Sequence, residues 1–218
     1  MDFVVRKNEV YGRLRIIRQM KSKNKLSLDV GSGAKEFRLA DITVDINFKA
    51  SPDIMADAIH LPFRSNVFDL CFFTDVIEHL PKGTELKALE EIHRVLCKGG
   101  EVILTAPHRR LLFIVFDPAW YLGHRCYRKH EISELLKQVG FQVLSLVTRG
   151  GFCTWLNWLW YCFIVYPWKK IFERPFVTKA GATDFLYSPS FLLSRDDKEY
   201  NAVTENGYTI FIRAKKVY

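Results

Sequence analysis

Short apolar runs alternate along most of the chain with stretches in which apolar residues recur at helical spacing. Seven runs predict strands, namely Lys25–Val30, Ile42–Ile46, Ile54–Ala56, Val67–Thr74, Glu101–Ala106, Phe141–Val147 and Tyr208–Lys215. Helical spacing occurs over Glu85–Cys97, with Lys98-Gly99-Gly100 as the stop, and over Lys129–Val139 before Gly140. Strands that alternate with helices predict a parallel α/β sheet with right-handed crossovers.

The length of 218 residues suits one α/β domain with a sizeable insertion, and is too short for two full domains. We expect an amphipathic N-terminal helix and a basic linker over residues 1–24, and a ligand-binding core over residues 25–149. A hydrophobic insertion follows over residues 150–206, and the last strand lies within residues 207–218.

Polar residues and glycines cluster where the predicted strands end, which is where parallel α/β sheets bind ligands. The clusters are Asp29 with Gly31, Ser32 and Gly33, then Asp45 with Ile46, Asp57 with Ala58, and Thr74 with Asp75. A glycine pair after a strand lets the backbone turn sharply and approach a ligand. Taken alone, the pair is equally consistent with an ordinary tight turn.

The glycine turn does not match a dinucleotide-binding fingerprint, which would place a third glycine at the sixth position. That position is Glu36, whose carboxylate would repel a pyrophosphate. A nucleoside without phosphate, such as S-adenosylmethionine (SAM), suits an acidic pocket better. Asp45 could accept hydrogen bonds from ribose hydroxyls, and Asp57 from an adenine amino group, while the Ala58 N–H donates to a ring nitrogen.

Five motifs in order and spacing resemble class I SAM-dependent methyltransferases of the methyltransferase type 11-like kind, and most closely the subgroup acting on small molecules, lipids or quinones. They are LDVGSG, VDI, DAIHLPF, FDLCFFTDVIEHL and EIHRVLCKGGEVILTAPH. The resemblance covers roughly Lys25 to Val147 and the last strand. It implies a doubly wound, Rossmann-like and mostly parallel seven-stranded sheet whose last strand is antiparallel, with SAM as cofactor.

The resemblance also implies roles for the clustered residues. The loop around the methionine part of SAM would be shaped by Asp29, Gly31, Ser32 and Gly33. The ribose would be bound by Asp45 with Ile46, and the adenine by Asp57 and Ala58. The methionine end and the acceptor would be faced by Thr74 and Asp75. The chain departs from the family at Lys35, where a further glycine is usual. The segment between Gly33 and Asp45 is also short, so the first helix should be stunted or irregular.

Methyl transfer is an in-line displacement, and it needs a general base when the acceptor is a hydroxyl. His79, beside Glu78 at a strand end, has a side chain suited to proton removal near neutrality. Asp75 is a further catalytic candidate because it would face the substrate. His124 is another, because the resembling family often has a histidine-arginine stretch near the acceptor pocket and His124-Arg125 matches it. The alternative readings are a histidine bonded at a helix start for His79 and a charged helix start for His124. We expect no metal site.

An aromatic-rich stretch over residues 150–170 contains all but one of the tryptophans and ends in Lys169 and Lys170. Three interpretations remain open: a segment in the membrane interface, an apolar lid over a hydrophobic acceptor, or a helix buried against the core or a homodimer partner. A second apolar run, Leu111–Phe116, could join the same surface. The first two interpretations predict a lipid-like acceptor and, for the first, peripheral membrane contact.

The net charge of +8 favours anionic partners such as nucleic acid, phosphorylated substrates or an acidic membrane. An Asn-Pro-Pro-aromatic signature is absent after the fourth strand, which counts against a nucleic-acid methyltransferase. Five scattered cysteines without a CxxC pair predict neither a structural zinc site nor a disulfide framework, and favour the cytoplasm. An RNA methyltransferase and a non-catalytic SAM-binding scaffold remain the alternatives.

Overall fold

The structure is a computed structural model. It describes residues 12–21, 25–33, 38–111, 114, 118–121, 123–165, 167, 195 and 198–218. Lys35, Glu36, Lys169, Lys170 and most of the apolar run Leu111–Phe116 therefore lie outside the described residues.

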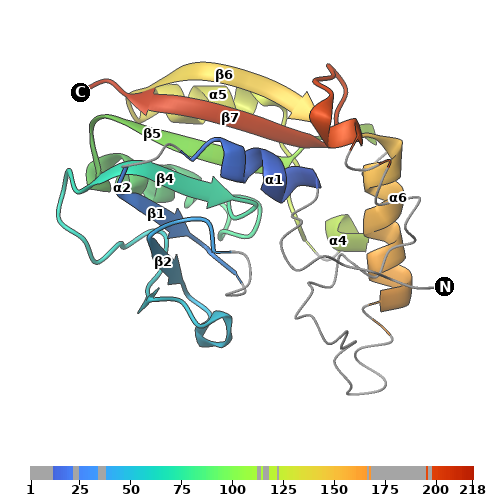
Figure 1. Ribbon diagram of the computed structural model, residues 1–218, viewed down its shortest axis with the longest axis horizontal. Coiled ribbons are helices and arrows are strands. Elements are labelled where there is room, and N and C mark those ends of the chain that lie inside the picture. The colour runs from blue at the N-terminus through green and yellow to red at the C-terminus, as the bar shows by residue number, and fades with distance from the viewer. Residues whose placement is uncertain are drawn as a thin grey trace.

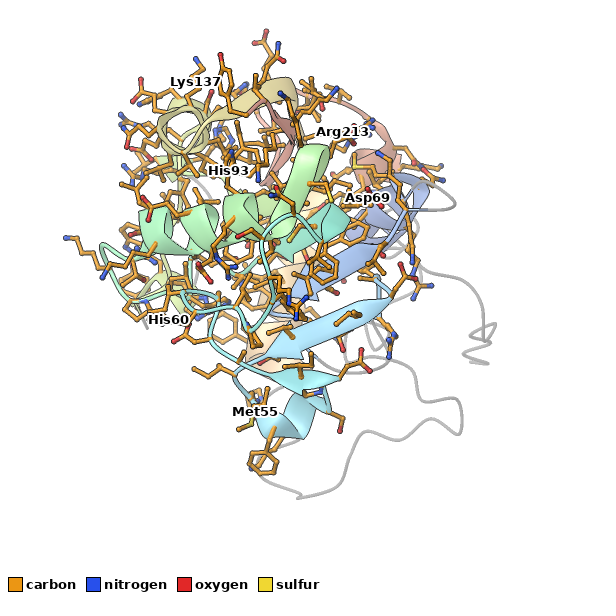
Figure 2. All side chains as sticks on the ribbon, turned by 90° about the vertical axis from the view of Figure 1, so that its left-hand side faces the viewer. Met55, His60, Asp69, His93, Lys137 and Arg213 are labelled. Atoms are coloured by element: carbon orange, nitrogen blue, oxygen red, sulfur yellow. The ribbon has the colours of Figure 1, made fainter. Side chains whose placement is uncertain are left out.

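Seven strands form a single sheet, as predicted. They are β1 (Ser27–Val30), β2 (Ile42–Asp45), β3 (Ile54–Met55), β4 (Phe68–Thr74), β5 (Leu96–Pro107), β6 (Phe141–Arg149) and β7 (Thr209–Lys216), in the order β3-β2-β1-β4-β5-β7-β6. The pairs among β1 to β5 are parallel, whereas β7 runs antiparallel to both β5 and β6. In Figure 2, Met55 lies at the β3 edge of this sheet, and Lys137 lies toward the opposite edge. The predicted doubly wound sheet with an antiparallel last strand is thus confirmed.

The strand order turns around β1, because the chain moves outward through β2 and β3 and then returns to place β4 on the other side. Ligands of doubly wound sheets bind in the crevice beyond the carboxyl ends of the strands at such a reversal. In Figure 1 the arrows of β4 and β6 point toward the side on which α4 (Pro118–Tyr121) and α6 (Phe152–Trp160) lie. These two helices therefore stand on the side where the ligand site is expected.

Helices cover both faces of the sheet because successive residues of the central strand point in opposite directions. On β4, Cys71 and Phe73 join the apolar core on the side of α2 (Glu85–Val95) and α5 (Lys129–Gln138). Leu70 and Phe72 join the second core with Ile16 and Ile17 of α1 (Gly12–Gln19), which lies across the sheet in Figure 1. A strand buried on both faces explains the nearly uninterrupted apolar run in this part of the sequence.

The strand β5 begins at Leu96, five residues before the predicted start, and α2 ends at Val95 instead of Cys97. Leu96 pairs with Phe68, and the register then jumps so that Leu70 pairs with Glu101. Gly99 has a φ of 78° within this irregular stretch. The glycines therefore bend a strand and do not terminate a helix, a distinction that depends on pairing with β4 and not on local sequence.

The described residues between β1 and β2 form no helix. Leu39 and Ala40 are buried there against Phe72 and Ile103, and so supply the apolar cover that a helix would give. Asp41 accepts hydrogen bonds from the Ser27 backbone N–H and from its hydroxyl, at 3.0 and 2.6 Å, and fixes the entry to β2.

After β6, the chain turns at Gly150 and Gly151 into α6, and a single π-helical turn over Tyr161–Val165 follows directly. Within the part of the chain that the structure describes, no helix has the length and apolar character needed to cross a membrane.

Candidate active site

The two glycines after β1 serve different purposes. Gly31, with a φ of 74°, and Ser32 both donate their backbone N–H to the Val44 carbonyl, at 2.8 and 3.1 Å. A Cβ on Gly31 would lie 2.4 Å from Cγ2 of Val76, so the missing side chain lets the loop after β4 pack against the turn. A Cβ on Gly33, whose φ is 61°, would meet no atom of the described residues within 4 Å. Of the two glycines, Gly33 is therefore the one with space beside it among the described residues.

Asp29 is almost fully buried on β1, with 1% of its surface exposed. Its Oδ1 has no hydrogen-bond partner among the described residues. Burial raises the pKa of this carboxyl to about 7; the nearby Asp45 adds to the rise, whereas a hydrogen bond from the Leu39 backbone opposes it. A buried carboxyl with an unused oxygen at the switch point of the sheet suits a cationic donor.

Asp45 ends β2 and accepts two backbone hydrogen bonds. Its Oδ2 accepts from Gly33 N and its Oδ1 from Asn47 N, each at 2.8 Å. A carboxylate offers about four lone-pair sites, so these bonds leave capacity for a ligand hydroxyl. The next residue, Ile46, is 70% exposed and presents apolar surface beside the carboxylate. Asp45 thus ties the glycine turn to β2 and keeps part of its hydrogen-bonding capacity.

Asp57 and Ala58 follow the edge strand β3 and lie close to Asp45, because the Ala56 N–H donates to the Asp45 carbonyl at 3.1 Å. The Asp57 Oδ1 accepts from Ile59 N, also at 3.1 Å, and closes the turn after β3. The structure therefore brings the two acidic strand ends predicted to hold a nucleoside to neighbouring positions on one edge of the sheet.

The end of β4 is fixed by β5. Thr74 is paired with Thr105, and the Asp75 N–H donates to the Thr105 carbonyl at 3.1 Å. The Thr105 hydroxyl donates to Asp75 Oδ1 at 2.9 Å. Asp75 has a φ of 53°, a left-handed conformation that aspartate tolerates better than most side chains. Thr105 therefore orients Asp75, a role that no motif in the sequence indicated.

His79 and His124 meet edge to face, with ring centroids 4.4 Å apart and planes at 83°. Desolvation lowers the pKa of His79, and so do the neighbouring His124 and Arg125, whereas Asp75 acts in the opposite direction. The imidazole of His79 is therefore mostly neutral near pH 7 and able to accept a proton. Residues 45 positions apart in the chain thus form one histidine pair, which the sequence could not predict.

His108 and His93 have other partners. His108 has its Nδ1 at 2.9 Å from the Gly207 carbonyl, so it joins the end of β5 to the chain before β7. His93 packs edge to face on Phe141, with centroids 5.0 Å apart, and Figure 2 shows His93 and His60 well separated from each other. Among the described residues, no group of three or more His, Cys, Asp or Glu side chains could hold a metal ion.

Two contacts that the sequence analysis missed shape the same edge. Val76 fills the space left open at Gly31, and the Tyr127 hydroxyl donates to the Ile77 carbonyl at 3.0 Å. Burial raises the pKa of Tyr127 to about 12, so its hydroxyl stays protonated as a donor. The sequence offered little indication that Tyr127 belongs to this edge, because a lone tyrosine among cationic residues does not reveal its hydrogen-bond partner.

Residues 28–104 match the family model described as "Methyltransferase domain". An uncharacterized protein of Methanocaldococcus jannaschii is 34% identical over 99 residues, which cover 40% of this chain and 43% of that protein. A tRNA (carboxymethyluridine(34)-5-O)-methyltransferase of Xenopus tropicalis is 36% identical over 67 residues, 30% of this chain and 10% of that protein. The chain thus spans less than half the length of both curated relatives.

Solved structures share the fold over nearly the whole chain. A SAM-dependent methyltransferase of Thermotoga maritima has a TM-score of 0.60 at 18% identity, and covers 93% of this chain and 87% of its own. One of Archaeoglobus fulgidus has a TM-score of 0.61 at 15% identity, with 94% and 91% covered. The [4+2]-cyclase SpnF has a TM-score of 0.63 at 16% identity, with 93% and 79% covered.

SpnF is named for a cyclisation, so this fold alone does not determine the chemistry of a chain. The domain match over residues 28–104 adds a family to the fold, and the strand order places the matched segment at the switch point of the sheet. Residues 28–104 therefore belong to the methyltransferase domain family, which implies SAM as cofactor.

Proposed function

We propose that the protein transfers a methyl group from SAM to a small or lipid-like acceptor at the carboxyl ends of β1, β2 and β4. The observation that carries the proposal is the pair Asp29 and Asp45. These carboxyl groups lie on neighbouring strands, close enough that Asp45 adds to the rise in the pKa of Asp29, and they flank the open turn at Gly33.

The residues at this edge fit SAM better than a phosphate-bearing nucleotide. The unused Oδ1 of Asp29 suits the α-ammonium group, and the remaining lone pairs of Asp45 suit ribose hydroxyls. We assign the adenine to Asp57 and Ala58, with Ile46 offering apolar surface beside it, and the methionine loop to Gly31, Ser32 and Gly33. Two carboxylates here would repel a phosphate, whereas SAM carries none.

SAM supplies, when bound, a methyl group on a positively charged sulfur. The task of the chain is then to hold the acceptor in line and to take up its proton if the acceptor is a hydroxyl. We assign proton uptake to the neutral imidazole of His79. His124 borders this ring, and Asp75, held by Thr105, orients the region beside Thr74.

The acceptor class is inferred from the apolar surface on the side of α4 and α6. Trp160, Phe163 and Ile164 on α6 and the turn after it are exposed, as is Trp120 on α4. Both helices lie on the side where the parallel strands end (Figure 1). This placement supports a lipid-like acceptor, and contact of the same surface with a membrane interface, where aromatic side chains are favoured.

A second candidate acceptor is RNA. It is favoured by the similarity over 67 residues to a tRNA methyltransferase and by the net charge of +8. Against it, the terminal residues of β4 and the loop after it, Thr74-Asp75-Val76-Ile77, carry no Asn-Pro-Pro-aromatic signature.

Calorimetry with SAM followed by transfer of a labelled methyl group tests the proposal. We expect SAM to bind, and label to enter the organic phase of a cellular lipid extract and not an RNA fraction offered in parallel. Label in RNA, with a shift in an electrophoretic binding assay, would establish the second candidate. Binding of SAM without transfer to either fraction would indicate a non-catalytic scaffold, and absence of binding would refute the site itself.

A further inference from the structure

The segment before α5 is held against the end of β5 by its backbone. The Tyr127 N–H donates to the Pro107 carbonyl at 2.9 Å, and the Arg109 N–H donates to the Tyr127 carbonyl at 2.7 Å. His108 and Tyr127 thereby form a parallel bridge that extends the sheet by one step. This segment also carries His124 and Arg125, so both residues start from a backbone anchored to the sheet.

The guanidinium of Arg125 binds a different loop, the turn between β4 and α2. Its Nη2 donates to the Ile77 carbonyl at 2.8 Å and to the Leu80 carbonyl at 2.5 Å. Its Nη1 forms an ion pair with Glu85 in the first turn of α2. The Arg125 side chain is 22% exposed, so most of its surface is covered by the protein.

Among the described residues, the guanidinium of Arg125 donates to the turn after β4 and to the first turn of α2, although an arginine next to His124 was expected near the acceptor. A planar guanidinium with several fixed donors can bind two carbonyls and a carboxylate at once, which a lysine ammonium does less well. Tyr127 adds its hydroxyl to the same Ile77 carbonyl. The turn that carries His79 is therefore tied at both of its ends to the segment that carries His124.

We propose that Arg125 is a positioning residue: by clamping the turn from Ile77 to Leu80 onto the segment before α5, it sets the edge-to-face contact of His79 with His124. This inference rests on the proposed function, in which His79 takes up the proton of the acceptor. Without the clamp, the two loops are joined at this point by the Tyr127 hydroxyl and the ring contact itself.

Three neighbouring groups affect the pKa of His79 through their charge. One is Asp75 at the end of β4, and the other two, His124 and Arg125, lie in the segment before α5. Replacing Arg125 by Lys keeps a positive charge and loses the planar donor geometry. Replacing it by Met removes the charge as well. The two variants therefore separate geometry from electrostatics.

The test uses the full chain with isotope-labelled histidine, whose ring signals are assigned with His79→Gln and His124→Gln. In Arg125→Lys we expect the mutual ring-current shifts of the two histidines to collapse and turnover to fall by up to about a hundredfold, the scale of a catalytic group misplaced by about 1 Å. SAM affinity should stay unchanged. In Arg125→Met we also expect the pKa of His79 to rise, because a neighbouring cation is removed.

Arg213→Lys is the matched control, because Arg213 pairs with Glu101 on the β5–β7 side of the sheet and should leave both ring signals in place. Wild-type ring shifts in a folded Arg125→Lys protein would overturn the inference. If that variant shows no cooperative melting, Arg125→Met decides: displaced ring signals of His79 and His124 support the clamp, and unchanged ones overturn it. If the wild-type protein transfers no methyl group to any acceptor, the proposed function fails, while the ring signals still decide whether Arg125 positions the pair.

Discussion

At the scale of single residues, the proposed function depends on two carboxyl groups, Asp29 and Asp45, whose surroundings differ. Asp29 is buried with one oxygen unused, whereas Asp45 is partly exposed and accepts two backbone hydrogen bonds. The two residues lie on adjacent parallel strands, β1 and β2, which end at the same edge of the sheet. Each would bind a different part of the same ligand. The two positions therefore call for different tests.

The ionisation of Asp29 should make SAM binding depend on pH. Its folded pKa is raised from 3.8 to about 7, so the carboxyl is neutral below that pH and cannot attract the ammonium group. We expect SAM affinity, measured by calorimetry, to fall about tenfold for each pH unit below the folded pKa. Asp29→Asn should bind weakly and show no such slope. A wild-type affinity that is flat between pH 5 and 8 would exclude this role.

The same shift affects stability without ligand. Between pH 3.8 and about 7 the folded state binds more protons at Asp29 than the unfolded state, so the free energy of unfolding should decrease as pH rises through this window. Urea unfolding at pH 5 and pH 8 measures the difference. Asp29→Asn should reduce this difference in unfolding free energy between the two pH values. Asp69→Asn, a change near the start of β4, should leave the difference as in the wild type.

Replacing Asp45 by Ala should weaken SAM binding by a hundredfold or so, since about 1–3 kcal/mol is typical for each hydrogen bond lost to a charged group. The backbone N–H groups of Gly33 and Asn47 would also lose their acceptor, which loosens the glycine turn. Calorimetry gives the affinity, and a thermal melt shows whether the fold persists. Unchanged affinity in a folded variant would contradict the assignment of the ribose to Asp45.

At the scale of elements, α6 is held to the body of the protein through its first turn. The Glu199 carboxylate accepts from the backbone N–H groups of Cys153 and Thr154, at 3.0 and 2.9 Å, and from the Thr154 hydroxyl at 3.1 Å. The first backbone N–H groups of a helix cannot pair with a carbonyl of the same helix, so an outside acceptor such as Glu199 satisfies them. A carboxylate at this end is also favoured by the helix dipole. A residue 45 positions away thus caps the helix that carries the aromatic surface.

Glu199→Ala should therefore loosen α6 and lower the free energy of unfolding by about 1–2 kcal/mol, the usual range for loss of a helix cap. Hydrogen exchange should accelerate at Cys153 and Thr154 before it changes in the buried strand β4. Glu205→Ala provides the control, since Glu205 accepts a hydrogen bond from Lys129 through its backbone carbonyl, which the substitution keeps. Equal exchange rates in both variants would show that the cap does not anchor the helix.

At the scale of the whole molecule, the carboxyl end of β4 and the helix α6 lie on the same side (Figure 1). Trp155 and Asn157 of α6 are buried, whereas Trp160, Phe163 and Ile164 are exposed. The helix therefore has one face packed against the protein and apolar side chains left for another surface. Under the proposed function, a lipid acceptor reaches the site from a membrane bound to this surface.

Changing Trp160, Phe163 and Ile164 together to Ser should reduce sedimentation with vesicles of mixed anionic and zwitterionic phospholipid severalfold, because burial of apolar side chains drives interfacial binding. SAM affinity should not change. Leu144→Ser, an exposed apolar position on the edge strand β6, is the control for a general loss of apolar surface. Equal sedimentation of all three proteins would exclude membrane contact through α6.

The sequence by itself determined the elements whose signal is local: an apolar run long enough to be buried on both faces, helical spacing in α2 and α5, and acidic residues at strand ends. Five motifs in order were enough to indicate the methyltransferase domain and the sheet with its antiparallel last strand. The prediction that Lys98-Gly99-Gly100 ends a helix was wrong. Whether glycines end a helix or bend a strand here depends on pairing with β4, which the local sequence does not reveal.

Tertiary structure alone decided which residues meet. The contact of Gly31 with Val76, the orientation of Asp75 by Thr105 and the clamp of Arg125 on the Ile77 carbonyl join positions far apart in the chain. Each side chain could bind many partners, and the choice among them is set by strand register and loop packing, not by local pattern. A pattern along the chain indicates where an element lies, whereas the contacts at an active site depend on how several elements pack together.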